Sequence, residues 1–219
     1  MTGISAEYYR VKDSCREGLL AYLQKAVSLL PLPENPLILD IGCGTGVPTL
    51  WLAGNCGGKI IAVDIDRSAI EWLDKKIIER KLESRITTLN MSFFDMEQGA
   101  GSFDIVLAEG LLNITGFRQG FVRVISMIRE GGFFVIHDEY KDHEKKCDFI
   151  KRNNCELRGT VYLDENVWWN QYYRQLDMYI NSISSKHKRD LFSTESQEIE
   201  LYRKDPSPFR SIYYVVKRL

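Results

Sequence analysis

The sequence predicts an α/β fold in which a mostly parallel sheet is covered by helices on both faces. Short apolar runs that suit buried strands alternate with amphipathic stretches of helical period, which is the pattern of successive βαβ units. The chain of 219 residues is 44% hydrophobic and 27% charged, as in an ordinary globular protein. This length and composition favour one folded domain.

The first part of the chain changes from a helical period to alternating strands and helices. Residues 5–30 carry leucines and a valine at helical spacing and end before Pro31, so one long helix is expected there. The elements expected next are a strand over 37–41, a helix over 49–53, a strand over 59–64 and a helix over 67–81.

The remaining elements continue this alternation as far as the last third of the chain. Further strands are expected over 85–91, 103–108 and 131–138, with a helix over 117–128 between the last two. The last third is expected to add a helix near 144–152, a strand over 157–163, a long polar helical region from 165 to about 190, and a closing strand over 212–216.

Charge, cysteine usage and hydropathy argue against several classes of protein. Lys and Arg total 29 against 30 acidic residues, a balance that does not suit a broad basic surface for nucleic acid. The five cysteines are widely spaced without a CxxC pair, which predicts reduced thiols rather than a disulfide framework or a zinc site. The first residues do not suit a secretory signal, and no apolar run has membrane-spanning length. We expect a cytoplasmic protein without a membrane partner; the sequence does not indicate its oligomeric state.

The most informative motif is D-I-G-C-G-T-G, which runs from Asp40 to Gly46 between a predicted strand and a predicted helix. Glycines at 42, 44 and 46, with Cys43 among them, permit a sharp turn and let a ligand approach backbone that a Cβ would shield. The helix that follows directs unpaired N–H groups toward whatever lies on the loop. The motif therefore predicts a ligand-binding turn.

An acidic residue at the end of the second strand suggests that this ligand contains a ribose. Asp64 lies 22 residues beyond Gly42, where its carboxylate can accept hydrogen bonds from both ribose hydroxyls. Dinucleotide sites usually show G-x-G-x-x-G, whereas the spacing here is G-x-G-x-G, and Asp40 would repel a pyrophosphate. A nucleoside with an amino-acid tail fits these charges better than NAD or FAD.

On these residues, the sequence resembles the class I S-adenosylmethionine-dependent methyltransferases of small-molecule type. The resemblance covers about residues 37–140, with weaker matches at M-S-F-F-D (residues 91–95) and at the end of the fourth strand. It implies a Rossmann-like, seven-stranded, mostly parallel sheet of order 3-2-1-4-5-7-6, with strand 7 antiparallel. It also implies S-adenosyl-L-methionine as cofactor, S-adenosyl-L-homocysteine as product, and no metal.

The resemblance assigns parts of the chain and individual residues to this reaction. It implies one domain over 1–219, with an N-terminal helical lid over 1–36, a cofactor-binding core over 37–140, and a part over 141–219 that completes the sheet and carries an acceptor-side helix. The implied cofactor-binding residues are Asp40, Gly42, Cys43, Gly44 and Gly46 at the methionine end, Asp64 and Ile65 at the ribose, Phe94 and Asp95 at the adenine, and Glu109 facing the methyl donor.

Two residues at strand ends are candidates for catalysis. Methyl transfer from a sulfonium is an in-line displacement that needs an aligned acceptor and, for a hydroxyl acceptor, a base. Glu109 either contacts the reacting groups or braces the backbone behind them. His137 is either that base or a histidine that is simply hydrogen-bonded in place. Metal assistance through Asp138 would need a second ligand at matching spacing, and none is evident.

Aromatic residues are candidates for the acceptor side of the site. Trp168 and Tyr172 are one helical turn apart, and they either wall an acceptor pocket or pack their helix on the sheet. Tyr9 belongs to the N-terminal segment that would close over the cofactor.

The expected substrate class depends mainly on a motif that the sequence lacks. The stretch from Ala108 to Leu111 lacks the proline-containing turn typical of enzymes that methylate amines of nucleic-acid bases. We expect transfer to a small molecule, at O or N in the first instance. Two alternatives remain: a methyltransferase acting on protein or RNA, and a regulatory or partner subunit that binds S-adenosylmethionine without turnover.

Overall fold

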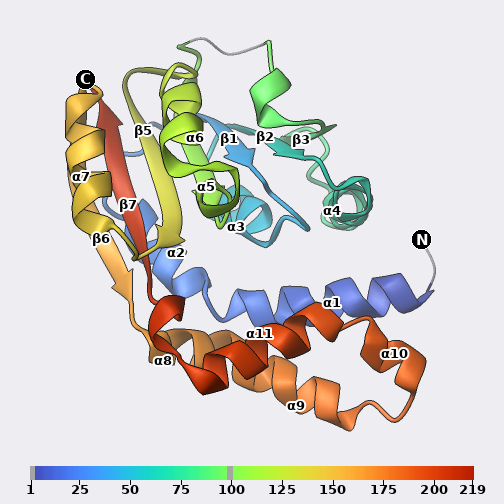
Figure 1. Cartoon of the computed structure of the whole chain (residues 1–219). Helices are drawn as coiled ribbons and strands as arrows, with labels where there is room; N and C mark the ends of the chain where they lie inside the picture. The colour runs from blue at the N-terminus through green and yellow to red at the C-terminus, as the bar shows by residue number, and fades with distance from the viewer. Residues whose placement is uncertain (1–2, 98–100) are drawn as a thin grey trace.

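The structure is a computed structural model that describes residues 3–97 and 101–219, and its centre is a seven-stranded sheet (Figure 1). The strand order is β3-β2-β1-β4-β5-β7-β6, and only β7 runs antiparallel to its neighbours within this sheet. The predicted fold class and strand order are therefore confirmed. The strands are β1 (Leu37–Ile41), β2 (Lys59–Asp64), β3 (Ile86–Asn90), β4 (Phe103–Glu109), β5 (Ile128–Glu139), β6 (Cys155–Leu163) and β7 (Ser211–Arg218).

Helices cover both faces of the sheet, which explains why the central strands are apolar throughout. Successive residues of a strand face opposite sides, so Ile38 of β1 packs into one core cluster and Leu39 into the other. One face is covered by α2 (Leu20–Val27), α3 (Val47–Asn55) and α4 (Arg67–Glu79), and the other by α5 (Leu112–Thr115), α6 (Phe117–Ile125) and α7 (His143–Arg152).

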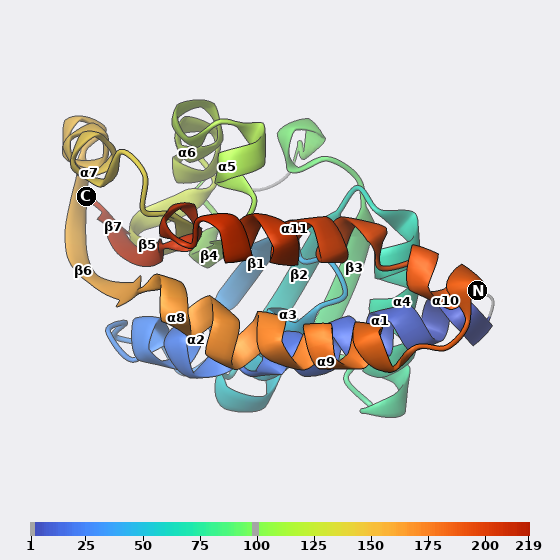
Figure 2. The ribbon, with the colours of Figure 1, turned by 60° about the horizontal axis from the view of Figure 1, so that its bottom comes forward.

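A third group of helices, which we call the cap, lies across the carboxyl ends of the parallel strands. Figure 2 looks onto these ends, with α11 passing in front of β1, β2 and β3 and with α1 and α9 running alongside. The cap comprises α1 (Gly3–Glu17), α8 (Glu165–Trp168), the π-helical turn η2 (Trp169–Tyr173), α9 (Arg174–Ser182), α10 (Lys186–Asp190) and α11 (Ser193–Lys204). The first and last parts of the chain thus meet over the end of the sheet where a ligand is expected.

The prediction of a single helix over 5–30 is wrong, because the helical conformation is interrupted between α1 and α2. Gly18 lies at this break, and a Cβ there would stand 2.2 Å from the carbonyl oxygen of Gln171. The backbone of η2 therefore approaches Gly18 more closely than any side chain permits. The apolar period continues through the break, which is why the sequence pattern did not reveal it.

The long polar helical region expected from 165 to about 190 is also corrected. It is divided into α8, η2, α9 and α10, and a further helix, α11, follows where no helix was expected. α11 is rich in Ser, Thr and Glu, and only Glu195 and Ile199 of it are buried, so it carries a weak apolar stripe.

None of the helices in the described ranges has the length and hydropathy of a membrane span.

Candidate functional site

A cavity of about 660 Å³ lies between the carboxyl ends of the strands and the cap. Its floor is formed by the loop after β1, by Asp66 after β2 and by Glu109 at the end of β4. Open α/β sheets bind ligands at this position, where the strand order reverses between β1 and β4. The cap side of the wall is formed by Tyr8, Tyr9, Lys12, Asp13, Arg16, Trp168, Tyr172, Tyr173 and Glu198.

The glycine loop has the backbone conformation that its motif predicts. Gly42, Gly44 and Gly46 all have positive φ, at 65°, 52° and 79°. A Cβ on Gly46 would meet the Leu73 side chain at 2.3 Å, whereas a Cβ on Gly44 would have no atom within 4 Å. Gly46 is thus required for packing against α4. Gly44 lines the cavity, and the absence of a Cβ at this position leaves open space there.

Asp40 is buried beneath this loop and accepts a hydrogen bond from Thr49, with 2.6 Å between Oδ2 and Oγ1. Burial raises the pKa of Asp40 to about 7, and the nearby charges of Glu109 and Asp64 act in the same direction. An ammonium group in the cavity would favour the charged form of this carboxyl. The site therefore has an anionic partner ready for the amino group of an amino-acid tail.

Asp64 ends β2 and braces the glycine loop. Its Oδ2 accepts the backbone N–H of Gly44 at 2.7 Å, and its Oδ1 accepts the N–H of Asp66 at 2.8 Å. A carboxylate oxygen has a second lone pair, so both oxygens retain the capacity to accept from a ribose. Among the described residues, Asp64 touches the loop directly but does not line the cavity itself.

Three further residues expected at the cofactor lie along the rim beyond Asp64. Ile65 is 75% exposed, Phe94 is half-buried against Phe93 with 4.1 Å between ring centroids, and Asp95 is exposed. They follow β2 and β3 at the same edge of the sheet but do not line the cavity. Their role in binding the adenine stays a prediction.

Glu109 ends β4 with both carboxylate oxygens already engaged. Oε2 lies 2.9 Å from the guanidinium of Arg16, and Oε1 accepts the hydroxyl of Tyr213 at 2.5 Å. The side chain of Glu109 is 8% exposed, and burial holds the pKa of Tyr213 well above its usual value. This arrangement anchors Glu109 and ties α1 to the end of β4 beside the cavity.

His137 is buried at the end of β5 and lines a second, adjoining cavity of about 330 Å³. Its Nε2 lies 2.9 Å from Ser211 Oγ, which also accepts the indole N–H of Trp168 at 3.0 Å. Ser211 thus links the imidazole of His137 to the indole of Trp168. Burial lowers the pKa of His137 to about 4, so the ring is neutral at pH 7 and favours a positioning role.

The aromatic residues expected on the acceptor side lie together at the boundary of the two cavities. Trp168 lines both cavities, and its ring centroid lies 5.9 Å from that of Tyr172, which lines the larger one. The chain forms a π-helical turn here, a distortion frequent at functional sites. Tyr9 also lines the larger cavity and stacks on Trp72 of α4, with centroids 6.0 Å apart.

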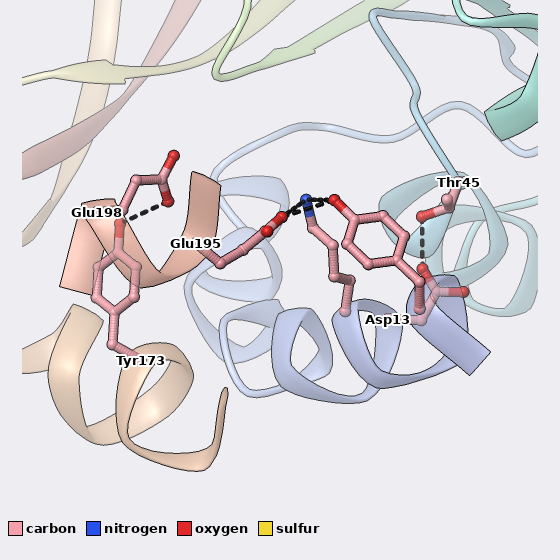
Figure 3. A network of polar contacts seen from close by, with 7 residues as sticks. Asp13, Thr45, Tyr173, Glu195 and Glu198 are labelled. Carbon is pink, nitrogen blue, oxygen red and sulfur yellow. Dashed lines mark hydrogen bonds and ion pairs between the residues drawn. The ribbon is translucent and has the colours of Figure 1, made fainter. Parts of the chain in front are cut away.

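The cap also contributes charged residues to the site that were not predicted from the sequence (Figure 3). Lys12 Nζ lies 2.7 Å from Glu195 Oε1, and Asp13 accepts the Thr45 hydroxyl at 2.5 Å. Tyr8, Lys12 and Arg16 recur at intervals of four residues, a spacing that places them on one face of α1 and was available as a signal. The carboxylates of α11 had no such signal, because only the fold brings α11 to the site.

Comparison with known proteins places the central part of this chain in a family. Residues 38–132 match the family model described as a methyltransferase domain. A sterol 24-C-methyltransferase of Kluyveromyces lactis is 27% identical over 108 residues, which is 49% of this chain and 29% of that enzyme. The chain spans roughly a quarter to two fifths of the length of the first curated relatives it matches.

Solved structures share the fold over most of the chain. The [4+2]-cyclase SpnF superposes with a TM-score of 0.76 at 14% identity, covering 89% of this chain and 78% of that one. A geranyl diphosphate methyltransferase in complex with S-adenosylmethionine gives 0.68 at 14% identity, covering 91% and 85%. The glycine motif, the strand order and the domain match over residues 38–132 are those of class I S-adenosylmethionine-dependent methyltransferases.

The residues present fit the cofactor of this family. The open space at Gly44 admits a ligand against the backbone, and the buried carboxyl of Asp40 suits an ammonium group. The cavity volume lies within the usual range for small-molecule sites. Nothing in the arrangement of the glycine loop opposes S-adenosylmethionine.

Proposed function

We propose that the protein is a methyltransferase that transfers the methyl group of S-adenosylmethionine to a small-molecule acceptor. The observation that carries this proposal is the pair of adjoining cavities at the carboxyl ends of the strands. They share Arg16, Trp168, Tyr173 and Glu198 as common lining. A donor in the larger cavity and an acceptor in the smaller one would meet at this shared boundary, as an in-line displacement requires.

Each end of the cofactor has its own residues in this proposal. Asp40 and the glycine loop hold the methionine end, and Asp64 holds the ribose. Ile65, Phe94 and Asp95 hold the adenine at the rim of the sheet. When bound, S-adenosylmethionine supplies the electrophilic methyl group on its sulfonium. The chain supplies binding, alignment and exclusion of water by the cap.

Glu109 and His137 act by positioning in this proposal. Glu109 is held by Arg16 and Tyr213, and it fixes α1 above the cavity. His137 is neutral and bonded to Ser211, so it orients the wall of the smaller cavity together with Trp168.

A small acceptor suits the dimensions and the charge of the site. The smaller cavity has a volume of about 330 Å³ and is bounded by the cap. The chain has a net charge of −1, which provides no general attraction for RNA. The similar proteins described above include a sterol 24-C-methyltransferase and a geranyl diphosphate methyltransferase, whose names both specify small-molecule acceptors.

The first test is isothermal titration with S-adenosylhomocysteine, S-adenosylmethionine and NAD. We expect the first two to bind and NAD not to bind. Asp64→Ala is expected to weaken their binding about 10- to 100-fold, since lost hydrogen bonds to a charged group cost about 1–3 kcal/mol. Asp148→Ala, which removes an exposed carboxylate on α7, is the matched control and should leave binding unchanged.

Transfer of a labelled methyl group to acceptors in a metabolite extract then separates an enzyme from a binding subunit. Since one protein of this fold bears the name of a cyclase, cofactor binding alone does not establish methyl transfer. Binding without any labelled product would favour the regulatory alternative. NAD binding in place of S-adenosylhomocysteine would refute the proposal.

A further inference from the structure

The smaller cavity has a composition that points to the chemical class of the acceptor. We propose that the acceptor is an aliphatic amine, received as its ammonium form between the carboxylate of Glu198 and an aromatic wall formed by Trp168, Tyr173 and Phe209. This inference rests on the proposed function. It adds the substrate class and names Glu198 as the residue that recognises it.

The aromatic wall is continuous along one side of the cavity. The ring centroid of Tyr173 lies 6.0 Å from that of Trp168 and 5.6 Å from that of Phe209, and all three residues line the cavity. Aromatic faces attract organic cations, and the attraction grows when the site excludes water. A neutral or anionic acceptor of the same shape lacks this attraction between positive charge and the ring faces.

Glu198 projects from α11 toward this wall and is the carboxylate that the two cavities share. Figure 3 shows its carboxylate beside the hydroxyl of Tyr173, which donates to Oε2 across 3.4 Å. This contact is long and leaves most of the acceptor capacity of Glu198 unused. Burial raises the pKa of Glu198, and the negative charge of Glu195 on the same helix adds to the effect.

Two of the three neighbouring cations are already in ion pairs. Arg16 forms its ion pair with Glu109, and Lys12 forms its ion pair with Glu195. The exposed Arg210 has its guanidinium 5.7 Å from the ring centroid of Tyr140 and donates Nε to the carbonyl of Ser207. Arg16 and Lys12 are therefore neutralised by other carboxylates, whereas Glu198 has no ion-pair partner among the described residues.

The shared position of Glu198 also suits the movement of charge in the reaction. The ammonium first gives one proton to the Glu198 carboxylate, which frees the nitrogen lone pair. The nitrogen–carbon bond then forms as the carbon–sulfur bond breaks, so the positive charge passes from sulfur to nitrogen. The proton that Glu198 accepted passes to solvent before the transfer, which restores the carboxylate. A fixed carboxylate near the nitrogen stabilises the charge that develops there.

The test compares a cationic ligand with its neutral isostere. Protein saturated with S-adenosylhomocysteine is titrated with choline and, separately, with 3,3-dimethylbutan-1-ol, in which carbon replaces the charged nitrogen. Three proteins are used: wild type, Glu198→Gln and Glu200→Gln. Glu200 is an exposed glutamate of α11 that pairs with Arg203 and lines neither cavity, so its variant is the matched control.

We expect wild type and Glu200→Gln to bind choline at least about tenfold more tightly than the alcohol, and Glu198→Gln to lose that preference. In a labelled-methyl assay, primary and secondary aliphatic amines should accept the methyl group and matched alcohols should not.

The possible outcomes distinguish a failure of the amine assignment from a failure of the proposed methyltransferase function. Normal S-adenosylhomocysteine binding without a preference for choline in wild type would overturn the amine assignment and leave the methyltransferase proposal standing. A preference that survives Glu198→Gln would overturn the role of Glu198. If S-adenosylhomocysteine does not bind wild type, the proposed function and this inference both fail.

Discussion

The charged side chains around the site are largely paired within the protein. Glu109 is paired with Arg16, Glu195 with Lys12, and Asp13 with Lys76 across 2.5 Å. An intact buried ion pair adds little net stability, whereas removal of one partner leaves an unpaired buried charge and is strongly destabilising. These pairs therefore fix the geometry of the site more than they stabilise the fold. Glu198 differs from them, because its one contact is a long one to a neutral hydroxyl. Residues that bind the substrate are expected among those the fold leaves unpaired.

His137 provides a prediction at the scale of one residue. Its pKa is about 4 in the folded protein and about 6.5 in an unfolded chain, because burial disfavours the charged ring. The resulting stabilisation is fully present above pH 6.5 and is lost as the pH falls toward 4. Between pH 7 and 4.5, wild type should lose about 2 kcal/mol more unfolding free energy than His137→Gln, which has no titrating ring. Urea denaturation at the two pH values measures this.

Comparison with the variant is essential because Asp40 titrates in the opposite sense. Its pKa is raised to about 7 in the fold, so its contribution to stability falls as the pH rises from about 3.8 toward 7. The difference between wild type and His137→Gln removes this common effect. Equal pH dependence in the two proteins would show that His137 is not held neutral by burial.

The break between α1 and α2 shows what an element boundary requires here. Gly18 faces the backbone carbonyl of Gln171, which cannot move aside as a flexible side chain would. Gly18→Ala is therefore expected to destabilise the protein by about 2 kcal/mol or more. Gly54 in α3 is the matched control, since a Cβ there would meet no atom within 4 Å. Gly54→Ala should stabilise the protein by about 0.5–1 kcal/mol through the better helix propensity of alanine.

Chemical denaturation of both variants measures the contrast between the two glycines. If Gly18→Ala is as stable as wild type, η2 can shift relative to α1, and the close approach of η2 to Gly18 is not a constraint. A loss of stability in Gly54→Ala would instead indicate that α3 tolerates no added side chain.

Sequence patterns predicted the elements of the sheet well and those of the cap poorly, for physical reasons. β1 and β2 are buried on both faces, so their apolar runs are unmistakable, and Asp40 and Asp64 are placed by those strands. The helix α11 is mostly exposed, and its few buried residues do not form a clear apolar stripe. Glu198 could therefore not be predicted as a candidate site residue from the sequence, because its position depends on contacts between distant parts of the chain.

At the scale of the whole molecule, the site is closed by the two ends of the fold acting together. α1 and the helices after β6 contribute to the same cap, and the Asp13 carboxylate links α1 to both Thr45 of the glycine loop and Lys76 of α4. Trp72 adds a third hydrogen bond to Asp13 from its indole N–H, at 2.9 Å. A ligand on the loop would thus lie under α1, and its binding should stabilise α1 as well as the loop.

Hydrogen exchange tests this coupling. At about a hundred times its dissociation constant, S-adenosylhomocysteine stabilises the folded state by about 2.7 kcal/mol through mass action. We expect this ligand to slow amide exchange in both the loop at 42–46 and α1, because a ligand on the loop would lie under α1. The central strand β4, which pairs with β1 and β5, is expected to exchange only through global unfolding and provides the internal reference. If binding protects the loop while α1 exchanges as fast as in the free protein, then α1 does not close over the cofactor, and Tyr9 and Lys12 do not belong to its site.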